Sequence, residues 1–155
     1  MGKYFVMSRR FDKRSAADFG LLPTGEPTAQ DPADGSTWVM AELYDFGWGR
    51  EHGFYRLPLP DYDALLELAL HGGETDDAYG AAAVILERYP DELLQSCEAL
   101  AGDPLAREEL QTLARLFALE VPINRSPTVH KSTEQVSRDH ARWQRLAETV
   151  RQNKR

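Results

Sequence analysis

The sequence predicts an α+β fold that is mainly α, with a small N-terminal antiparallel sheet packed on a bundle of about five helices. Two patterns predict it: β-favouring residues separated by turn residues before position 60, and capped amphipathic segments after it. A chain of 155 residues can bury about two-thirds of its unfolded surface. We expect a single domain over 1–155, made of a β region over 1–60, a four-helix unit over 61–121, and a linker with a C-terminal basic amphipathic helix over 122–155.

The N-terminal β region should contain three strands. Residues 4–7 and 38–46 are rich in β-favouring types, and 54–57 forms a returning strand after a glycine-rich turn over 47–53. The stretch 22–37 is rich in Pro, Gly, Asp and Thr, which predicts a long loop. A hairpin alone is marginally stable, so we expect this one to pack on the helices that follow.

Helix boundaries are well marked between 61 and 121. Asp61 and Thr75 occupy expected N-cap positions, and Asp103 precedes a proline suited to the first helical turn. Glycine or proline follows each of the four segments. Four helices with short turns can stack as two antiparallel pairs. That arrangement resembles HEAT-like helical repeats in outline only, because no repeat of fixed period is present.

A last helix is predicted to begin after Ser132, which forms a capping box with Gln135, and to run to about residue 152. A spacing of seven residues within its apolar stripe suits a coiled coil or a partner groove, but docking on the protein's own body is more common. The stripe contains Val136, His140, Trp143, Ala147 and Val150.

Charge is distributed unevenly along the chain. The net charge of −7 divides into +4 over residues 1–14, −16 over 15–124 and +5 over 125–155. A block with this much negative charge repels nucleic acid and favours a basic partner. The alternative interpretation is that its charge only keeps the protein in solution. The basic ends are expected to fold back on the acidic block, because the nearest opposite charge is on the same chain. Contact with nucleic acid or a membrane surface is the alternative.

Several classes of protein are disfavoured. The longest apolar run is about six residues, far short of the roughly 20 that a membrane span needs, and no secretory apolar segment lies within the first 20 residues. The single cysteine, Cys97, excludes an internal disulfide framework and fits a reducing compartment. We therefore expect a cytoplasmic protein.

No cofactor and no dedicated metal site are expected, because the four histidines lack ligand spacing and no glycine-rich phosphate loop is present. Cys97 lies on an apolar helix face and is predicted to be buried and inert. A divalent cation near His71 would need Glu74, Asp76 and Asp77 as ligands. Acidic residues at the start of a helix are already explained by their favourable interaction with the helix dipole.

Aromatic residues are concentrated in the predicted hairpin. Strand alternation predicts that half of them face outward; the alternative is that all of them pack against the helices in the core. Outward rings, Trp48 with Tyr44 or Phe46, would serve as interface anchors, and nearby acids disfavour RNA stacking. The six are Trp38, Tyr44, Phe46, Trp48, Phe54 and Tyr55. The candidate partner-binding residues are Tyr44, Asp45, Trp48, Glu51, Glu74, Asp76 and Asp77.

These features favour a non-enzymatic acidic binding protein that neutralises or regulates a basic protein partner such as a toxin, in the manner of immunity proteins and antitoxins. The oligomeric state is left open. One alternative is a regulatory protein whose basic C-terminal helix binds nucleic acid or a partner helix. Another is a hydrolase with a dispersed site in the hairpin region, built from His52, Glu51 and Asp45.

Overall fold

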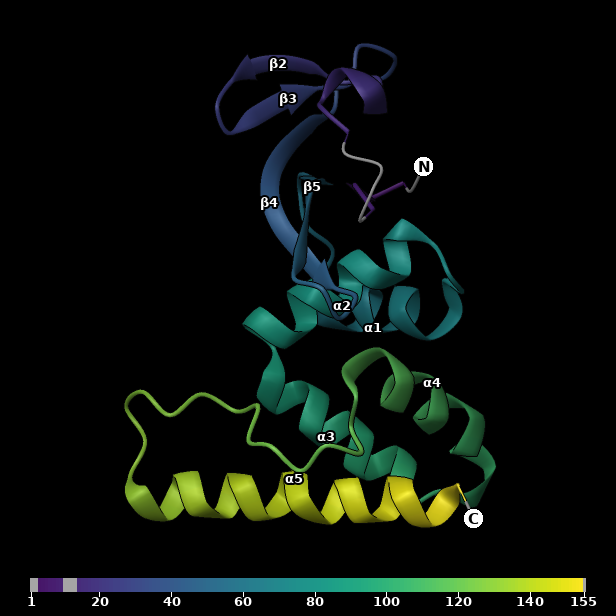
Figure 1. Cartoon of the computed structure of the whole chain (residues 1–155), viewed down its shortest axis with the longest axis vertical. Coiled ribbons are helices and arrows are strands. Elements are labelled where there is room, and N and C mark those ends of the chain that lie inside the picture. The colour runs from purple at the N-terminus through teal and green to yellow at the C-terminus, as the bar shows by residue number, and fades with distance from the viewer. Residues whose placement is uncertain (1–2, 10–13, 155) are drawn as a thin grey trace. The chain divides into compact units, whose positions relative to one another are not determined.

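The computed structural model describes residues 3–9 and 14–154 (Figure 1). These residues form one five-stranded antiparallel sheet and five α-helices, which confirms the predicted α+β, mainly α class. The chain divides into two compact units, Met1–Val84 (unit 1) and Ile85–Arg155 (unit 2). The boundary falls inside the segment predicted as a four-helix unit, and the single domain stays a prediction.

The sheet of unit 1 has the strand order β1-β5-β4-β3-β2, with every neighbouring pair antiparallel. Figure 1 shows β4 as a long curved strand that pairs with β5 and, near its start, with β3. The three strands predicted from the sequence correspond to β1, β4 and β5. The strands are β1 (Phe5–Met7), β2 (Leu22–Gly25), β3 (Thr28–Gln30), β4 (Thr37–Asp45) and β5 (Arg50–Arg56).

The predicted long loop over 22–37 is wrong over 22–30, where β2 and β3 form a hairpin that joins the sheet. Proline and glycine are tolerated here because β2 is an edge strand, in which the missing N–H of Pro23 need not interrupt the ladder. Besides the two-residue turn at 26–27 inside this hairpin, 31–36 retains turn character. There the carboxylate of Asp31 accepts a hydrogen bond from the N–H of Ala33 at 2.9 Å.

The glycine-rich turn predicted over 47–53 is shorter than expected, because β5 already begins at Arg50. Gly53 lies within this strand, opposite Met7 and Ala41. A Cβ atom at Gly53 would stand only 2.3 Å from the carbonyl oxygen of Val6. This glycine therefore permits the close approach of β1 to β5.

The sheet is covered on both faces within unit 1. On one face, the buried side chains of Val6 and Phe54 meet Phe19 from the short 3-10 helix Ala17–Phe19. On the other face, β1 packs against α2 so closely that a Cβ at Gly80 would lie 2.1 Å from Cγ of Phe5. The helices of this region are α1 (Tyr62–His71) and α2 (Asp76–Arg88).

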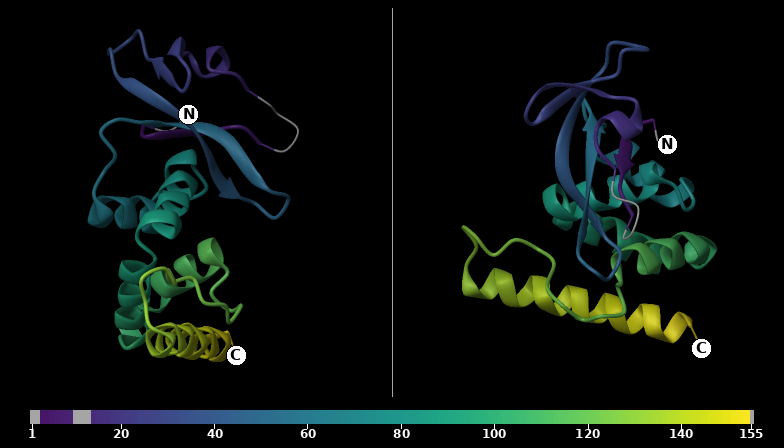
Figure 2. Two further views of the ribbon diagram at one scale, coloured as in Figure 1. Left: turned by 90° about the vertical axis from the view of Figure 1, so that its left-hand side faces the viewer. Right: turned by 45° about the horizontal axis from the view of Figure 1, so that its top comes forward.

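Unit 2 is built from α3 (Pro90–Ala101), α4 (Arg107–Phe117) and α5 (Thr133–Asn153), and Figure 2 shows the 118–132 segment running alongside α5. The fourth predicted helix begins with a 3-10 turn, Pro104–Ala106, after the Asp103 cap. The capping box of Ser132 and Gln135 is present.

The C-terminal helix docks on its own unit, which was the more common of the two arrangements weighed from sequence. Trp143 is fully buried, and its indole N–H donates to Oγ of Ser126 at 2.9 Å. The buried side chains of α5 are Trp143, Leu146, Ala147 and Val150, so the apolar stripe is used inside unit 2.

The basic C-terminal segment also pairs with acids of unit 2, as expected from the charge pattern. Arg142 forms a two-pronged ion pair with Glu98 of α3, and this hydrogen bonding raises the pKa of the arginine. Lys131 lies 2.7 Å from Asp139 and 3.4 Å from Asp91. In the N-terminal basic block, Arg10 and Lys13 lie outside the described residues.

Candidate partner-binding site

An aromatic cluster lies where the tip of the β4–β5 hairpin meets α2. The ring centroid of Tyr79, on α2, lies 5.0 Å from that of Tyr44 and 4.8 Å from that of Phe46. Phe46 in turn stacks on Trp48, with centroids 5.6 Å apart and planes inclined by only 17°. A register shift between Glu42 and Asp45 alters the alternation at the end of β4 and thereby helps to aim Tyr44 at the helix.

Arg9 completes this group, which we call the hairpin-tip cluster (Arg9, Tyr44, Phe46, Trp48 and Tyr79). Its guanidinium carbon lies 4.5 Å from the ring centroid of Phe46 and 5.3 Å from that of Tyr79. The same guanidinium forms an ion pair with Asp76 at 2.6 Å. The cluster thus already holds one arginine by ring faces and a carboxylate, a combination that suits guanidinium recognition.

Two of the acids predicted to bind a partner have internal roles. One carboxylate oxygen of Asp77 accepts from the backbone N–H groups of Tyr4 and Phe5 at 2.8 and 3.0 Å. The other oxygen of Asp77 accepts from the backbone N–H of Lys3 at 2.9 Å, and Asp76 accepts from the backbone N–H of Met7 at 3.3 Å. These bonds tie the first turn of α2 to β1. Glu74, just before this turn, is exposed.

The acids of the hairpin tip shape its surface. Oδ1 of Asp45 accepts from the N–H groups of Gly47 and Gly49 at 2.7 and 3.0 Å, which fixes the turn. Oε1 of Glu51 accepts from the indole N–H of Trp48 at 2.5 Å. Trp48 keeps 47% of its surface exposed, so this acid orients a surface ring.

The structure therefore separates the seven predicted residues into two groups. Tyr44, Trp48, Asp45 and Glu51 lie together at the hairpin tip, and Asp76 reaches the same cluster through Arg9. Asp77 is directed at the backbone of β1, and no contact joins Glu74 to the cluster among the described residues. Whether the seven bind a partner stays a prediction.

Sequence reasoning missed Arg9 and Tyr79 as members of the site and named Phe46 only as one option. Arg9 and Tyr79 lie far from the hairpin in sequence and reach it only because β1 and α2 pack together. The compositional signal that was present, a concentration of aromatic residues at the tip, identified Trp48 and Tyr44.

The described residues do not gather the proposed hydrolase groups. Glu51 and His52 are consecutive in β5 and so project from opposite faces of the sheet. Glu51 holds the Trp48 indole, whereas the His52 ring meets Phe54 at a centroid distance of 5.6 Å. No group of three or more His, Cys, Asp or Glu suited to a metal ion occurs within 3–9 and 14–154. Cys97 is buried, and burial raises the pKa of its thiol to about 12.

No helix in the part of the chain that the structure describes has the length and apolar character to span a membrane. Comparisons with protein-family models, curated proteins and solved structures found no match to this chain.

Proposed function

We propose that the chain is a binding protein that neutralises or regulates a basic protein partner, and that the hairpin-tip cluster is the centre of the contact surface. The observation that carries the proposal is Trp48. It is a large aromatic ring, 47% exposed, stacked on Phe46 and held by Glu51. Exposed tryptophan anchors on ordered elements are typical of the residues that dominate interface energetics.

Charge supports a basic partner. Unit 1 carries 14 acidic and 7 basic residues, whereas unit 2 carries 11 of each. The whole net charge of −7 therefore belongs to the unit that contains the hairpin-tip cluster. Such a field accelerates encounter with a basic protein and disfavours nucleic acid.

The internal contacts of Arg9 indicate the kind of side chain that the surface suits. Phe46, Tyr79 and Asp76 together hold its guanidinium, through two ring contacts and one carboxylate contact. Trp48 with Glu51 offers the same pair of chemical groups at the exposed end of the cluster. We infer that the partner presents arginine or lysine there, as an immunity protein or antitoxin would meet a basic toxin.

The alternative use of the basic C-terminal helix has less support. Its apolar stripe is buried in unit 2, and Lys131, Arg142 and Lys154 pair with acids of the same unit. The proposal keeps the cytoplasm as the place of action, since the single cysteine is buried and free.

The experiment is affinity capture from lysate of the native host, treated with nuclease, followed by titration of the captured protein against variants. Trp48→Ala and Glu51→Lys should each weaken binding by at least tenfold, and the association rate of the parent should fall steeply with salt. Matched controls are Leu105→Ala, which removes a side chain 96% exposed in unit 2, and Glu134→Lys on α5.

Equal affinity of the parent and both hairpin variants for the captured protein would overturn this assignment of the surface. Capture that disappears after nuclease treatment would favour the nucleic-acid alternative instead.

A further inference from the structure

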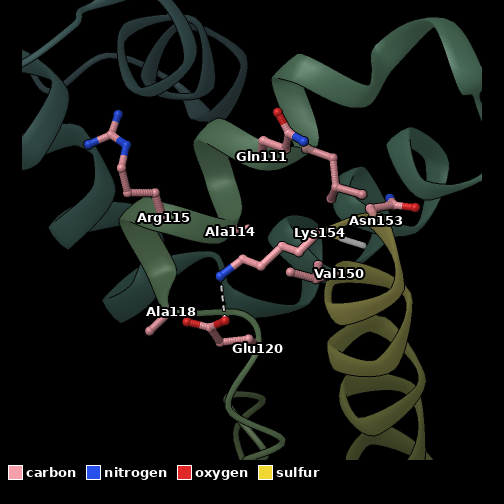
Figure 3. A pocket seen from close by; sticks show the side chains of 9 residues that line it. Gln111, Ala114, Arg115, Ala118, Glu120, Val150, Asn153 and Lys154 are labelled. Carbon is pink, nitrogen blue, oxygen red and sulfur yellow. Dashed lines mark hydrogen bonds and ion pairs between the residues drawn. The ribbon is translucent and has the colours of Figure 1, made fainter.

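Unit 2 contains a pocket between α4 and the C-terminal end of α5 (Figure 3). Its volume is about 480 Å³, within the range of roughly 300 to 1,000 Å³ found for small-molecule sites. The pocket is lined by Leu110, Gln111, Ala114, Arg115, Ala118, Glu120, Val150, Asn153 and Lys154.

The floor of the pocket is apolar. Leu110 and Ala114 come from the buried face of α4, and Val150 comes from the buried face of α5. None of the nine lining residues is aromatic, so the pocket offers no ring on which a nucleobase could stack. This floor suits an aliphatic body.

The rim is polar and mainly cationic. Figure 3 shows the side chain of Lys154 extended toward Glu120, with which it forms an ion pair at 2.5 Å. Arg115 is a second lining cation. Two more guanidinium groups adjoin the rim, because Arg107 donates to the carbonyl of Asn153 and Arg151 donates to the carbonyl of Glu120 at 2.8 Å.

This arrangement leaves Glu120 as the single carboxylate among the lining residues, facing several cations. The hydrogen bond from Lys154, aided by the charge of Arg151, lowers the pKa of Glu120, as a locally positive field requires. Both members of the ion pair are about half exposed, with 58% of the lysine side chain and 49% of the glutamate side chain accessible. An exposed pair of this kind is held weakly and exchanges readily for another anion.

We propose that this pocket binds a small amphipathic organic anion, an aliphatic chain that ends in a carboxylate. The chain would cover Leu110, Ala114 and Val150, and the carboxylate would replace Glu120 as the partner of Lys154. An inorganic anion would leave the apolar floor uncovered, and an organic cation would meet the positive rim. The site is independent of the proposed partner-binding function.

The test is calorimetric titration of the full chain with decanoate, decanol and decyltrimethylammonium, each below the concentration at which it aggregates. Decanoate should bind most tightly and the cation most weakly. Lys154→Met keeps an apolar stem but removes the charge, and it should weaken decanoate binding about two- to fivefold. Arg145→Met, at an exposed position of α5 outside the pocket, is the matched control and should bind as the parent does.

A second variant tests the location of the site. Gln111 is exposed at the mouth, so Gln111→Trp should block the pocket while leaving the melting temperature of the protein unchanged. Absence of decanoate binding would overturn the proposal. So would equal binding of decanol and decanoate, or undiminished binding to a folded Gln111→Trp variant.

Discussion

Unit 1 and unit 2 contain similar numbers of acidic residues but use them differently. In unit 2, Asp91, Glu98 and Glu120 form ion pairs with bases of the C-terminal segment, and the unit is neutral by formal charge. In unit 1, Asp76 and Asp77 bind backbone donors of the β1 segment, Asp76 also pairs with Arg9, and a net charge of −7 is left over. A run of acids in the sequence therefore says little about surface potential until its internal partners are known.

The acidic block over 15–124 illustrates this point. It carries −16 as a sequence segment, but it crosses the boundary between the units. Its C-terminal part is neutralised by the basic tail, whereas its N-terminal part keeps its charge beside the hairpin-tip cluster. The electrostatic argument for a basic partner thus applies to unit 1 alone.

The largest expected effect separates a core tryptophan of unit 2 from a surface tryptophan of unit 1. Trp143→Ala should lower the free energy of unfolding by about 3–5 kcal/mol, because it leaves a cavity and an unpaired Ser126 hydroxyl. Trp48→Ala should lower it by only about 1 kcal/mol, the worth of its stacking on Phe46. Denaturant unfolding measures both, and equal losses would erase the distinction between core and contact surface.

The second effect tests whether the α2 acids of unit 1 are structural. Asp77→Ala removes the acceptor of three backbone N–H groups and should cost about 2 kcal/mol of unfolding free energy. Glu74→Ala, two positions before the helix, is the control and should cost little. Hydrogen exchange should show the loss of protection in β1. If the two variants behave alike, the carboxylate bonds of Asp77 contribute nothing.

The third effect measures the ion pairing that distinguishes unit 2. A double-mutant cycle with Glu98→Gln and Arg142→Met should give a coupling free energy of about 0.5–1 kcal/mol, reduced by added salt, because both side chains are about one-third exposed. Reversing the exposed Glu67 of unit 1, whose side chain is 71% accessible, should leave stability nearly unchanged. A coupling of zero would mean that the pair of Glu98 and Arg142 does not help to hold the tail.

The smallest effect concerns pH. The folded pKa of Glu120 lies below its ordinary value of 4.5, so the unfolded chain binds more protons in that interval. The contribution of this group is therefore complete above pH 4.5 and is lost as the pH falls through the folded pKa. The melting temperature should fall less steeply from neutral to acidic pH for Glu120→Gln than for the parent. Identical slopes would contradict a lowered pKa of Glu120 in the folded protein.

Local signals in the sequence were reliable. The caps at Asp61 and at Ser132 with Gln135 formed as expected, because a cap depends on residues within one helical turn. The strand pairing of β2 with β3 was missed, since Pro23 and Gly25 indicate a loop unless the strand is known to lie at an edge.

The site was predictable only in part, for a related reason. Trp48 and Tyr44 were found because they belong to one aromatic stretch of sequence. Arg9 and Tyr79 join them through the packing of β1 on α2, which depends on the missing side chain of Gly80. Sequence spacing carries no information about such a contact.

The carboxylates at the start of α2 also limit how far the sheet can grow. The N–H groups of Lys3, Phe5 and Met7, at alternate positions of the β1 segment, are bonded to Asp77 and Asp76. The other hydrogen-bonding edge of β1 pairs with β5. An incoming strand from another molecule would find its hydrogen-bond donors occupied and two negative charges in their place. Polymerisation through β1 is blocked by the protein's own helix.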